Sequence, residues 1–499
     1  MDALPVDGLP PGWVEASLDT ICEINPATDV SGLPSDAPVT FVPMAAVGTL
    51  TNTIDTSKTR PLREITTGFT RFRSGDVIFA KITPCMENGK IALVPELPHG
   101  IGIGSTEFHV LRPKPGVDAG YVCHFVMREA FRAAARRSMS GAVGQQRVPA
   151  GYLREATIPV APTAEQARVV AAVDAAFEKV GAGEAAILRT REALTQFRAS
   201  LLHAACTGAL TAGWRAANRT NEADDNFLML LMAARRELNG RRNRAVLPPD
   251  TSDGPPLPSG WCWASVDQIT DFVGNGLARA PDGDVTDRRI LRISAVRPLK
   301  VDRGEHRFYR PLPEESLAGA TMQRHDLLFT RYSGSEQYVG VCGLVRFEDP
   351  MLFPDKVMCA RPLSGFSDVA EYLEIALNAG PSRAYIARNI RTTAGQKGVA
   401  GSSIRACPVP LPPRREMAAI VAAVREAESG TTGLPSGDVA AQLRQSILHA
   451  AFTGRLVPQD PVDEPAATLL TRLRATPATA RSSRRRRTAA QPNLIETPA

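Results

Sequence analysis

The sequence predicts an α+β protein, a tandem repeat of two mixed α/β globules that are each followed by a helical arm. The first observation is a repeat at the ends of the arms. LTQFRASLLHAACTG (194–208) and AAQLRQSILHAAFTG (440–454) share nine residues in the same order. The second is a repeated entrance, LPPGWVEASLDTICEI (9–24) and LPSGWCWASVDQITDF (257–272). The third is the offset between matching motifs, which stays between 246 and 251 positions. Agreement of this kind indicates an internal repeat.

The composition is that of a soluble globular protein, with 43% hydrophobic and 22% charged residues in a chain of 499. No apolar run reaches transmembrane length and the N-terminus lacks a signal-peptide pattern, so we expect a cytoplasmic location. The eight cysteines lack metal-binding spacing, and we expect reduced thiols. The net charge of +6 permits a nucleic-acid partner without requiring one.

Each globule shows the same succession of elements. An apolar strand, a polar turn that contains glycine and a second apolar strand predict a hairpin at 75–94 and again at 325–345. A helical segment follows, at 119–137 in the first copy and 369–379 in the second. The two copies therefore predict one mixed α/β fold of about 150 residues.

A Gly–Gln loop follows the helical segment in each copy, and Gln145 matches Gln396. A Pro-rich strand then closes each globule. Trp13 and Trp261 stand at the two entrances, and we expect both to pack in the cores because large aromatic residues are mostly buried.

The first arm is predicted as one helix over 163–208, with a capping box at Thr163 and Gln166 and a stop at Gly208. Apolar residues follow the spacing of a coiled coil, namely Val170, Val173, Phe177, Val180, Ile187, Leu194 and Leu201. Charged residues fill the alternate seam positions, namely Glu184, Arg191 and Arg198. Such a helix spans ~65 Å, which is typical of a spacer.

The rest of the chain is less regular. GTTGLPSG (430–437) interrupts the second arm, which predicts two shorter helices. Between the copies we expect a linker with a short helix at 226–238 and a basic run at 240–244. The C-terminal segment lacks apolar periodicity and is expected to be disordered. Its arginines 484–487 fit a solvated tail better than a DNA contact.

No complete catalytic or cofactor motif occurs in the sequence. GIGIGS (100–105) lacks the lysine and the helix of a phosphate-binding loop, and there is neither a P-loop nor an amino-methyltransferase tetrapeptide. Asp76, Glu87 and Lys90 come nearest to a metal nuclease site, but the second copy keeps only the aspartate, Asp326. We therefore predict no catalytic residue and no metal site. A duplicated binding protein is the simplest interpretation, and DNA suits it because duplex sites recur at fixed distance and phase.

Taken together, these motifs resemble the specificity (S) subunits of type I restriction–modification systems over essentially the whole chain. The resemblance is carried by LPPGW and LPSGW, by GDVIFAKITPCMENGK (75–90), by IPVAPTAEQARVVAAVDAAFEK (158–179), and by the paired LLHAACTG and ILHAAFTG. It implies two target recognition domains that each read half of a split double-stranded DNA site, and two arms that pack antiparallel. Because the two copies have diverged, the site is expected to be asymmetric.

The resemblance also implies the partners. Two methyltransferase subunits would dock on the arms, and it stays open whether restriction subunits join them. The chain itself would be non-catalytic and bind no cofactor. S-adenosylmethionine, ATP and Mg would belong to the partner subunits, in a complex that methylates adenine at N6 and cleaves DNA with ATP.

The implied domains follow the repeat. They are a first recognition domain (1–161), a helical spacer (162–215), a linker with a short helix (216–256), a second recognition domain (257–412), a distal helical arm (413–458) and a largely disordered basic tail (459–499).

The candidate DNA contacts are polar or basic residues on the hairpins, the Gly–Gln loops and the helix at 119–137. In the first globule they are Lys81, Thr83, Asn88, Gly89, Lys90, Arg128, Arg132, Arg136, Gln145, Gln146 and Arg147. In the second globule they are Arg331, Ser333, Ser335, Gln337, Gln396 and Lys397. The three arginines four residues apart are expected to share one helix face and contact phosphates. The loop residues offer donors and acceptors to base edges.

The candidate subunit-docking residues lie on the arms. They are Val170, Val173, Phe177, Leu194, Leu201, His203, Leu443, Ile447 and His449. Two histidines of this set, His203 and His449, are paired by the repeat and are expected in packing or interface roles rather than in catalysis.

Three alternatives remain open at this stage. The chain could serve a methylation-only complex, it could be a stand-alone DNA-modifying enzyme, or it could be a scaffold that binds only protein. An assay of the purified chain with methyl donor, Mg²⁺ and DNA separates the enzyme from a recognition subunit.

Overall fold

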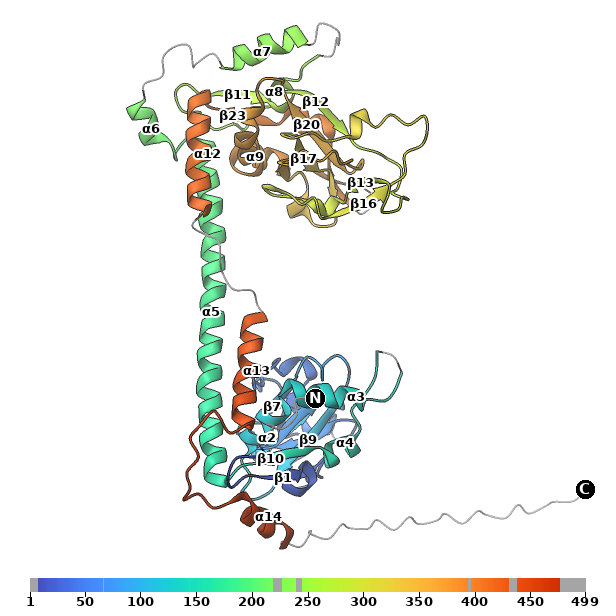
Figure 1. Cartoon of the computed structure of the whole chain (residues 1–499), viewed down its shortest axis with the longest axis vertical. Helices are drawn as coiled ribbons and strands as arrows, with labels where there is room; N and C mark the ends of the chain where they lie inside the picture. The colour runs from blue at the N-terminus through green and yellow to red at the C-terminus, as the bar shows by residue number, and fades with distance from the viewer. Residues whose placement is uncertain are drawn as a thin grey trace, which may run out of the picture. The chain divides into compact units, whose positions relative to one another are not determined.

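The computed structural model describes residues 8–475 apart from 66, 143, 219–226, 239–244, 394–395 and 430–437. The described chain divides into two compact units (Figure 1). Unit 1 takes its residues from Met1–Ile187 and Pro435–Ala499, and unit 2 is Leu188–Leu434. Each unit holds one α/β globule and one pair of helices, so the predicted fold class is confirmed.

The elements of unit 1 are as follows. Its strands are β1 (Val14–Ser17), β2 (Cys22–Ile24), β3 (Pro38–Val42), β4 (Thr59–Pro61), β5 (Thr70–Arg73), β6 (Val77–Ala80), β7 (Ile91–Leu93), β8 (Ile101–Gly104), β9 (Phe108–Pro113) and β10 (Thr157–Val160). Its helices are α1 (Leu18–Ile21), α2 (Ala119–Val126), α3 (Glu129–Arg137), α4 (Ala150–Glu155), the first part of α5 (Thr163–Thr207), α13 (Asp438–Phe452) and α14 (Ala466–Ala475).

The globule of unit 1 contains two four-stranded sheets. One has the order β2-β9-β6-β7 and is antiparallel throughout, and the predicted hairpin at 75–94 supplies its β6 and β7. The other has the order β4-β3-β8-β5, with β3 and β8 parallel. The entrance strand β1 pairs with the Pro-rich strand β10, so the two ends of the globule meet beside the start of α5.

Unit 2 has the corresponding elements. Its strands are β11 (Cys262–Ser265), β12 (Thr270–Asn275), β13 (Arg288–Leu291), β14 (Val296–Arg297), β15 (Lys300–Val301), β16 (His306–Tyr309), β17 (Leu327–Thr330), β18 (Tyr332–Ser333), β19 (Cys342–Leu344), β20 (Val357–Pro362), β21 (Ile390–Thr393), β22 (Gln396–Val399) and β23 (Pro408–Leu411). Its helices are the rest of α5, α6 (Ala212–Ala217), α7 (Phe227–Leu238), α8 (Val266–Ile269), α9 (Ala370–Asn378), α10 (Gly380–Arg388), α11 (Gly401–Ala406) and α12 (Arg414–Ser429).

The internal repeat extends to individual contacts. The sheet β12-β20-β17-β19 of unit 2 has the same strand pattern as β2-β9-β6-β7, and β11 pairs with β23 as β1 pairs with β10. In both sheets a buried aspartate accepts two hydrogen bonds from an arginine of the neighbouring strand. Asp76 pairs with Arg112 at 2.8 Å, and Asp326 pairs with Arg361 at 2.7 Å. Since the same side chains make these contacts in both units, the two copies share a fold and not only short motifs.

The first arm is the single helix α5, which passes Gly181 and Gly183 without a break. Its predicted capping box does not form. The Thr163 hydroxyl instead donates to the carbonyl of Gly116 (3.2 Å), and the Gln166 amide donates to the carbonyl of Ala161 (2.8 Å). The start of α5 is therefore held by contacts with the globule rather than by a local cap.

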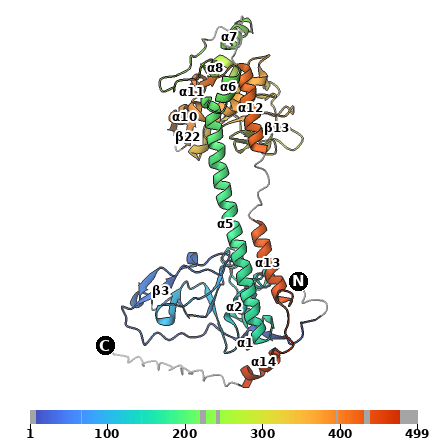
Figure 2. The ribbon, with the colours of Figure 1, turned by 90° about the vertical axis from the view of Figure 1, so that its left-hand side faces the viewer.

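Antiparallel packing of the arms occurs within each unit. In unit 1, α13 runs beside α5 in both views (Figures 1 and 2), and the seam residue Glu184 pairs with Arg444. In unit 2, the seam residue Arg198 pairs with Glu428 of α12 at 2.8 Å. Two of the predicted charged seam positions, Glu184 and Arg198, thus form ion pairs with the helix packed beside α5. The second arm forms two helices, as predicted, and the interruption at 430–437 lies outside the described residues.

Each globule is closed by the helix that follows the other globule. The core of unit 1 contains three buried residues of α13, namely Leu448, Ala451 and Phe452. The core of unit 2 contains the three matching residues of α5, namely Leu202, Ala205 and Cys206. The duplicated LHAAxTG segments therefore make equivalent contacts in an exchanged arrangement.

Three segments differ from the sequence-based prediction. The helix expected at 119–137 is two helices, because the backbone of Arg128 is extended between α2 and α3. The tail expected from 459 onwards begins with ordered structure, since Leu469 and Leu470 of α14 are buried in the core of unit 1. In the expected linker, α7 buries Phe227 and Leu231 in the core of unit 2. The basic runs at 240–244 and 484–487 lie outside the described residues. None of the described helices is long and apolar enough to cross a membrane.

Candidate functional site

The predicted hairpin turn and Gly–Gln loop of the first globule lie together. Ile82 and Arg147 form an antiparallel β-bridge, and the Thr83 backbone N–H donates to the carbonyl of Gln146 (3.0 Å). The Val148 N–H donates to the carbonyl of Lys81 (2.9 Å). Two segments about 60 residues apart thus form one polar edge, whose turn presents the exposed Asn88 and whose loop presents the exposed Gln145.

The second globule makes the same connection. Strand β18 pairs with β22, with Tyr332 opposite Gly398 and Ser333 opposite Lys397. The Val399 N–H donates to the carbonyl of Arg331 (3.1 Å), as Val148 does to Lys81. The pairing therefore recurs at offsets of 250 and 251 residues, and in each globule it brings the hairpin segment and the Gly–Gln loop together.

Several candidates in the first turn serve its architecture. The Lys90 ammonium donates to the carbonyls of Met44 (3.1 Å) and Val47 (2.8 Å). Gly89 is buried with a φ of 73°, and a Cβ there would stand 2.4 Å from the side chain of Leu50. Only glycine fits this backbone and this close approach. Lys90 and Gly89 therefore shape the turn, and their groups are not presented to a ligand.

Arg132 also holds the turn. Its Nη1 donates to the carbonyl of Glu87, and its Nε donates to the carbonyl of Met127 (3.3 Å). Arg383 has the matching role in unit 2, where its Nη1 donates to the carbonyl of Val339 (2.7 Å). Burial lowers the pKa of both guanidinium groups. The repeat of this contact in both units makes it an architectural feature of the fold.

The predicted arginine face is therefore wrong. Arg128 lies before α3, not on it, because its extended backbone forms the N-cap. Its guanidinium carbon lies 5.4 Å from the ring centre of Phe125 and 5.5 Å from that of Phe452. Arg136 alone of the three has a largely exposed side chain, at 71%, with its Nε 3.9 Å from a Glu87 carboxylate oxygen.

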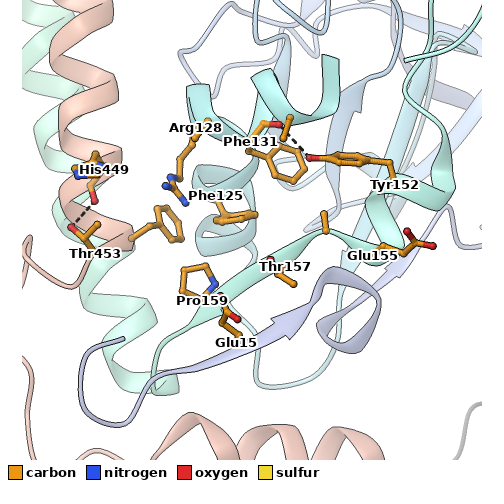
Figure 3. Close-up of a pocket in the computed structure, with 14 residues that line it drawn as sticks. Glu15, Phe125, Arg128, Phe131, Tyr152, Glu155, Thr157, Pro159, His449 and Thr453 are labelled. Atoms are coloured by element: carbon orange, nitrogen blue, oxygen red, sulfur yellow. Dashed lines mark hydrogen bonds between the residues drawn. The ribbon is translucent and has the colours of Figure 1, made fainter. Parts of the chain in front are cut away.

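A pocket of about 450 Å³ separates α3 from α13 in unit 1 (Figure 3). Arg128, which precedes α3, and His449 of α13 both line it, together with Phe125, Phe131 and Tyr152. From the sequence, Arg128 was predicted to contact DNA and His449 to contact a partner subunit. The structure instead places both side chains in one pocket.

The remaining candidates of the first globule surround an ion pair. Arg147 donates through Nε and Nη2 to the two carboxylate oxygens of Glu107, both at 2.9 Å. These hydrogen bonds hold the pKa of Glu107 below its ordinary value. The Thr83 hydroxyl donates to Glu87 (3.2 Å), and the half-buried Lys81 lies on the strand end beside Glu107.

In the second globule the candidates are more accessible. Ser335, Gln337 and Gln396 are exposed. The Ser333 hydroxyl accepts from the Ser335 N–H (3.1 Å), and Lys397 forms an ion pair with Glu336. The Arg331 guanidinium carbon lies 4.9 Å from the ring centre of Tyr332.

Sequence reasoning missed Glu107, Arg383 and Lys356. Arg383 lies 251 positions after Arg132, so the repeat offset alone would have found it. Glu107 and Lys356 carry no motif, and only the backbone pairing shows that they are equivalent. The Lys81 N–H donates to the Glu107 carbonyl as the Arg331 N–H donates to that of Lys356, both at 2.9 Å.

The residues that came nearest to a metal site are engaged elsewhere. Asp76 pairs with Arg112, and Lys90 donates to backbone carbonyls, as described above. No group of three or more His, Cys, Asp or Glu side chains is arranged to hold a metal ion within the described parts of the chain.

The candidate docking residues divide into two sets. Val173 is buried and Val170, Phe177 and Ile447 are half-buried against the core of unit 1, and Leu201 packs on that of unit 2. Leu194 is half-buried. His203, Leu443 and His449 are exposed, so these three offer surface on the arms.

Comparison with known proteins agrees with this architecture. No protein-family model matches the chain. The EcoKI specificity subunit of the type I restriction enzyme of Escherichia coli strain K12 is 30% identical over 381 residues, which cover 73% of each chain. The EcoEI specificity subunit of Escherichia coli is 26% identical over 89% of this chain and 82% of its own.

A solved structure shares the fold. It comes from work on complex assembly and conformational transition of the type I R-M system, with a TM-score of 0.56 and 20% identity over 90% of this chain and 99% of that chain. The duplicated globules, the antiparallel arms and the similarity to these relatives over most of their length show that the chain belongs to the specificity subunits of type I restriction enzymes.

Proposed function

We propose that this chain reads an asymmetric, bipartite double-stranded DNA site, with one half-site for each globule. The observation that supports this most is the pairing of hairpin turn and Gly–Gln loop, which both units build with the same backbone hydrogen bonds. The side chains on these edges differ, as Glu107 and Lys356 show at one equivalent position. A shared scaffold with different polar groups suits two readers of different sequences.

The chain is proposed to act without catalysis of its own. Two methyltransferase subunits would dock on the arms, where His203, Leu443 and His449 are exposed. S-adenosylmethionine, ATP and Mg would be held by partner subunits, in a complex that methylates adenine at N6 and, where restriction subunits join, cleaves DNA. The purified chain, incubated alone with methyl donor, Mg²⁺ and DNA, should leave the DNA unmodified.

Exchange of one globule tests the reading of half-sites. Replacing residues 9–161 with the corresponding segment of a relative should change one half-site and leave the other as it was. Sequencing of methylated bases in host DNA measures both at once. The reciprocal exchange of 257–412 is the control, and it should change only the other half. Alteration of both halves by one exchange would contradict separate reading.

Helix α5 is proposed to set the spacing between the half-sites, because it contributes residues to both units without interruption. Four residues inserted after Arg189 add ~6 Å and turn the helix by ~400°, slightly more than one full turn, so the seam is roughly kept. For an arm along the duplex, the preferred spacer should lengthen by one or two base pairs, at ~3.4 Å each.

A three-residue insertion at the same place is the control for this test. It turns the seam by ~300° and should impair assembly more than the longer insertion does. If the four-residue variant methylates the original spacer as efficiently as the parent chain, another segment sets the spacing.

A further inference from the structure

A pocket of about 270 Å³ opens beside the paired turn and loop of the second globule. Its wall combines two aromatic residues, Tyr332 and Tyr338, with two cations, Arg297 and Lys356. Ser333 and Gln396, both among the predicted DNA contacts, also line it. The pocket therefore lies at the edge where unit 2 is expected to meet DNA.

The two cations are available as donors. Lys356 is exposed and forms no ion pair with any described residue. The Arg297 guanidinium carbon lies 4.7 Å from the ring centre of Tyr338, and only its Nη1 has a hydrogen-bond acceptor among the described residues, the carbonyl of Val296 at 2.9 Å. The nearby acid Glu336 is already paired with Lys397. The pocket thus carries uncompensated positive charge and N–H donors.

The equivalent place in the first globule has the opposite chemistry. Glu107 stands where unit 2 has Lys356, and it is paired with Arg147, which stands where unit 2 has Gly398. Gly48 follows Val47 as Arg297 follows Val296, after a short 3₁₀ turn in each unit. An internal ion pair therefore occupies in unit 1 the position that unit 2 keeps open and cationic.

We propose that Arg297 and Lys356 determine specificity for a guanine in the second half-site, and that the matching position of the first half-site lacks this contact. Guanine presents two acceptors, O6 and N7, in the major groove, and Arg and Lys are the side chains that bind them best. Tyr332 and Tyr338 form the aromatic sides of the pocket, and Gln396 adds a donor at its rim. This inference rests on the proposed reading of two half-sites.

The test is selection of binding sequences from a random DNA pool by the full chain together with its modification subunits. The parent chain should select a bipartite sequence with a guanine in the half-site of unit 2. Arg297→Ala and Lys356→Met should each reduce the preference for that guanine by between about 5-fold and about 150-fold. The half-site of unit 1 should stay unchanged in both variants.

Three controls make the result specific. Lys356→Arg keeps the positive charge, and this variant should still select the guanine. Arg307→Ala removes an exposed cation of the same globule, on β16 outside the pocket, and should leave all selected letters unchanged. Replacing the guanine with 7-deazaguanine, which lacks the N7 acceptor, should weaken binding by the parent chain and have little effect on a chain that carries both Arg297→Ala and Lys356→Met.

Two outcomes would overturn the proposal. If both variants bind all sequences more weakly while the selected letters stay the same, the cations contact phosphate and specify nothing. If the selected letters change only in the half-site of unit 1, the pocket is not the reader. If the parent chain selects no bipartite sequence, that result would contradict the proposed function itself. The two failures are therefore distinguishable.

Discussion

Glu416→Ala should lower the free energy of unfolding of unit 2 by about 3–5 kcal/mol, because the change leaves buried polar groups without their charged partner. The Glu416 side chain is fully buried. One carboxylate oxygen accepts from Trp261 Nε1 (2.9 Å), and the other accepts from the Thr211 hydroxyl (2.6 Å) and from Arg215. Urea denaturation combined with hydrogen exchange read by mass spectrometry measures the loss and assigns it to unit 2.

The repeat supplies a matched control for this prediction. Glu165 holds the same position in unit 1 and accepts from Trp13 Nε1 (2.9 Å), but its other oxygen is buried with no hydrogen-bond partner among the described residues. Burial raises the pKa of Glu165. Glu165→Ala should therefore cost only about 1–3 kcal/mol, the loss of one buried hydrogen bond. Equal losses in the two variants would show that the Arg215 and Thr211 contacts contribute nothing.

Phe452→Ala should destabilise unit 1 by about 3–5 kcal/mol through the cavity that it leaves. The Phe452 side chain is 1% exposed, and its ring centre lies 4.8 Å from that of Tyr121 and 5.3 Å from that of Phe125. Because those partners belong to α2, hydrogen exchange should accelerate in α2 although the substitution lies more than 300 residues later in the sequence.

Leu443→Ala is the control on the same helix. Its side chain is 49% exposed, so the effect on unfolding should stay within about 0.5 kcal/mol. If the Phe452→Ala chain loses hydrogen-exchange protection only in α13 and keeps it in α2, then α13 does not complete the core of the first globule.

Much of the fold follows from the sequence because its strongest signals are local or duplicated. Gly208 ends α5 at the predicted place, and the interruption at 430–437 separates two helices as expected. The sequence could not predict that the end of α5 packs on the second globule and α13 on the first. The constant offset between the two copies would be the same if each arm packed on the globule that precedes it. The sequence also did not predict that α14 is an ordered helix, because Leu469 and Leu470 form only a short apolar stretch beside a basic tail.

The candidate site was predicted at the level of segments and less well at the level of residues. Gln145 and Gln396 marked the two loops that pair with the hairpin turns, because both copies keep glutamine there. Arg132 was misassigned because spacing by four residues suggests a helix face, whereas the break at Arg128 has no glycine or proline to announce it. The partner of Arg147 was not predictable because Glu107 is 40 residues away and belongs to no motif.

The exchanged arms also determine when the first globule can complete its core during synthesis. Ribosomes synthesise the first globule early, but its core stays incomplete until α13 and α14 have emerged, roughly 290 and 315 residues after β10. At ~5–20 residues per second, the apolar surface of α2 waits on the order of 15–60 s for its last partners. During that interval the nascent chain offers a hydrophobic face that molecular chaperones recognise, so its yield in cells should depend on them more than its final stability suggests.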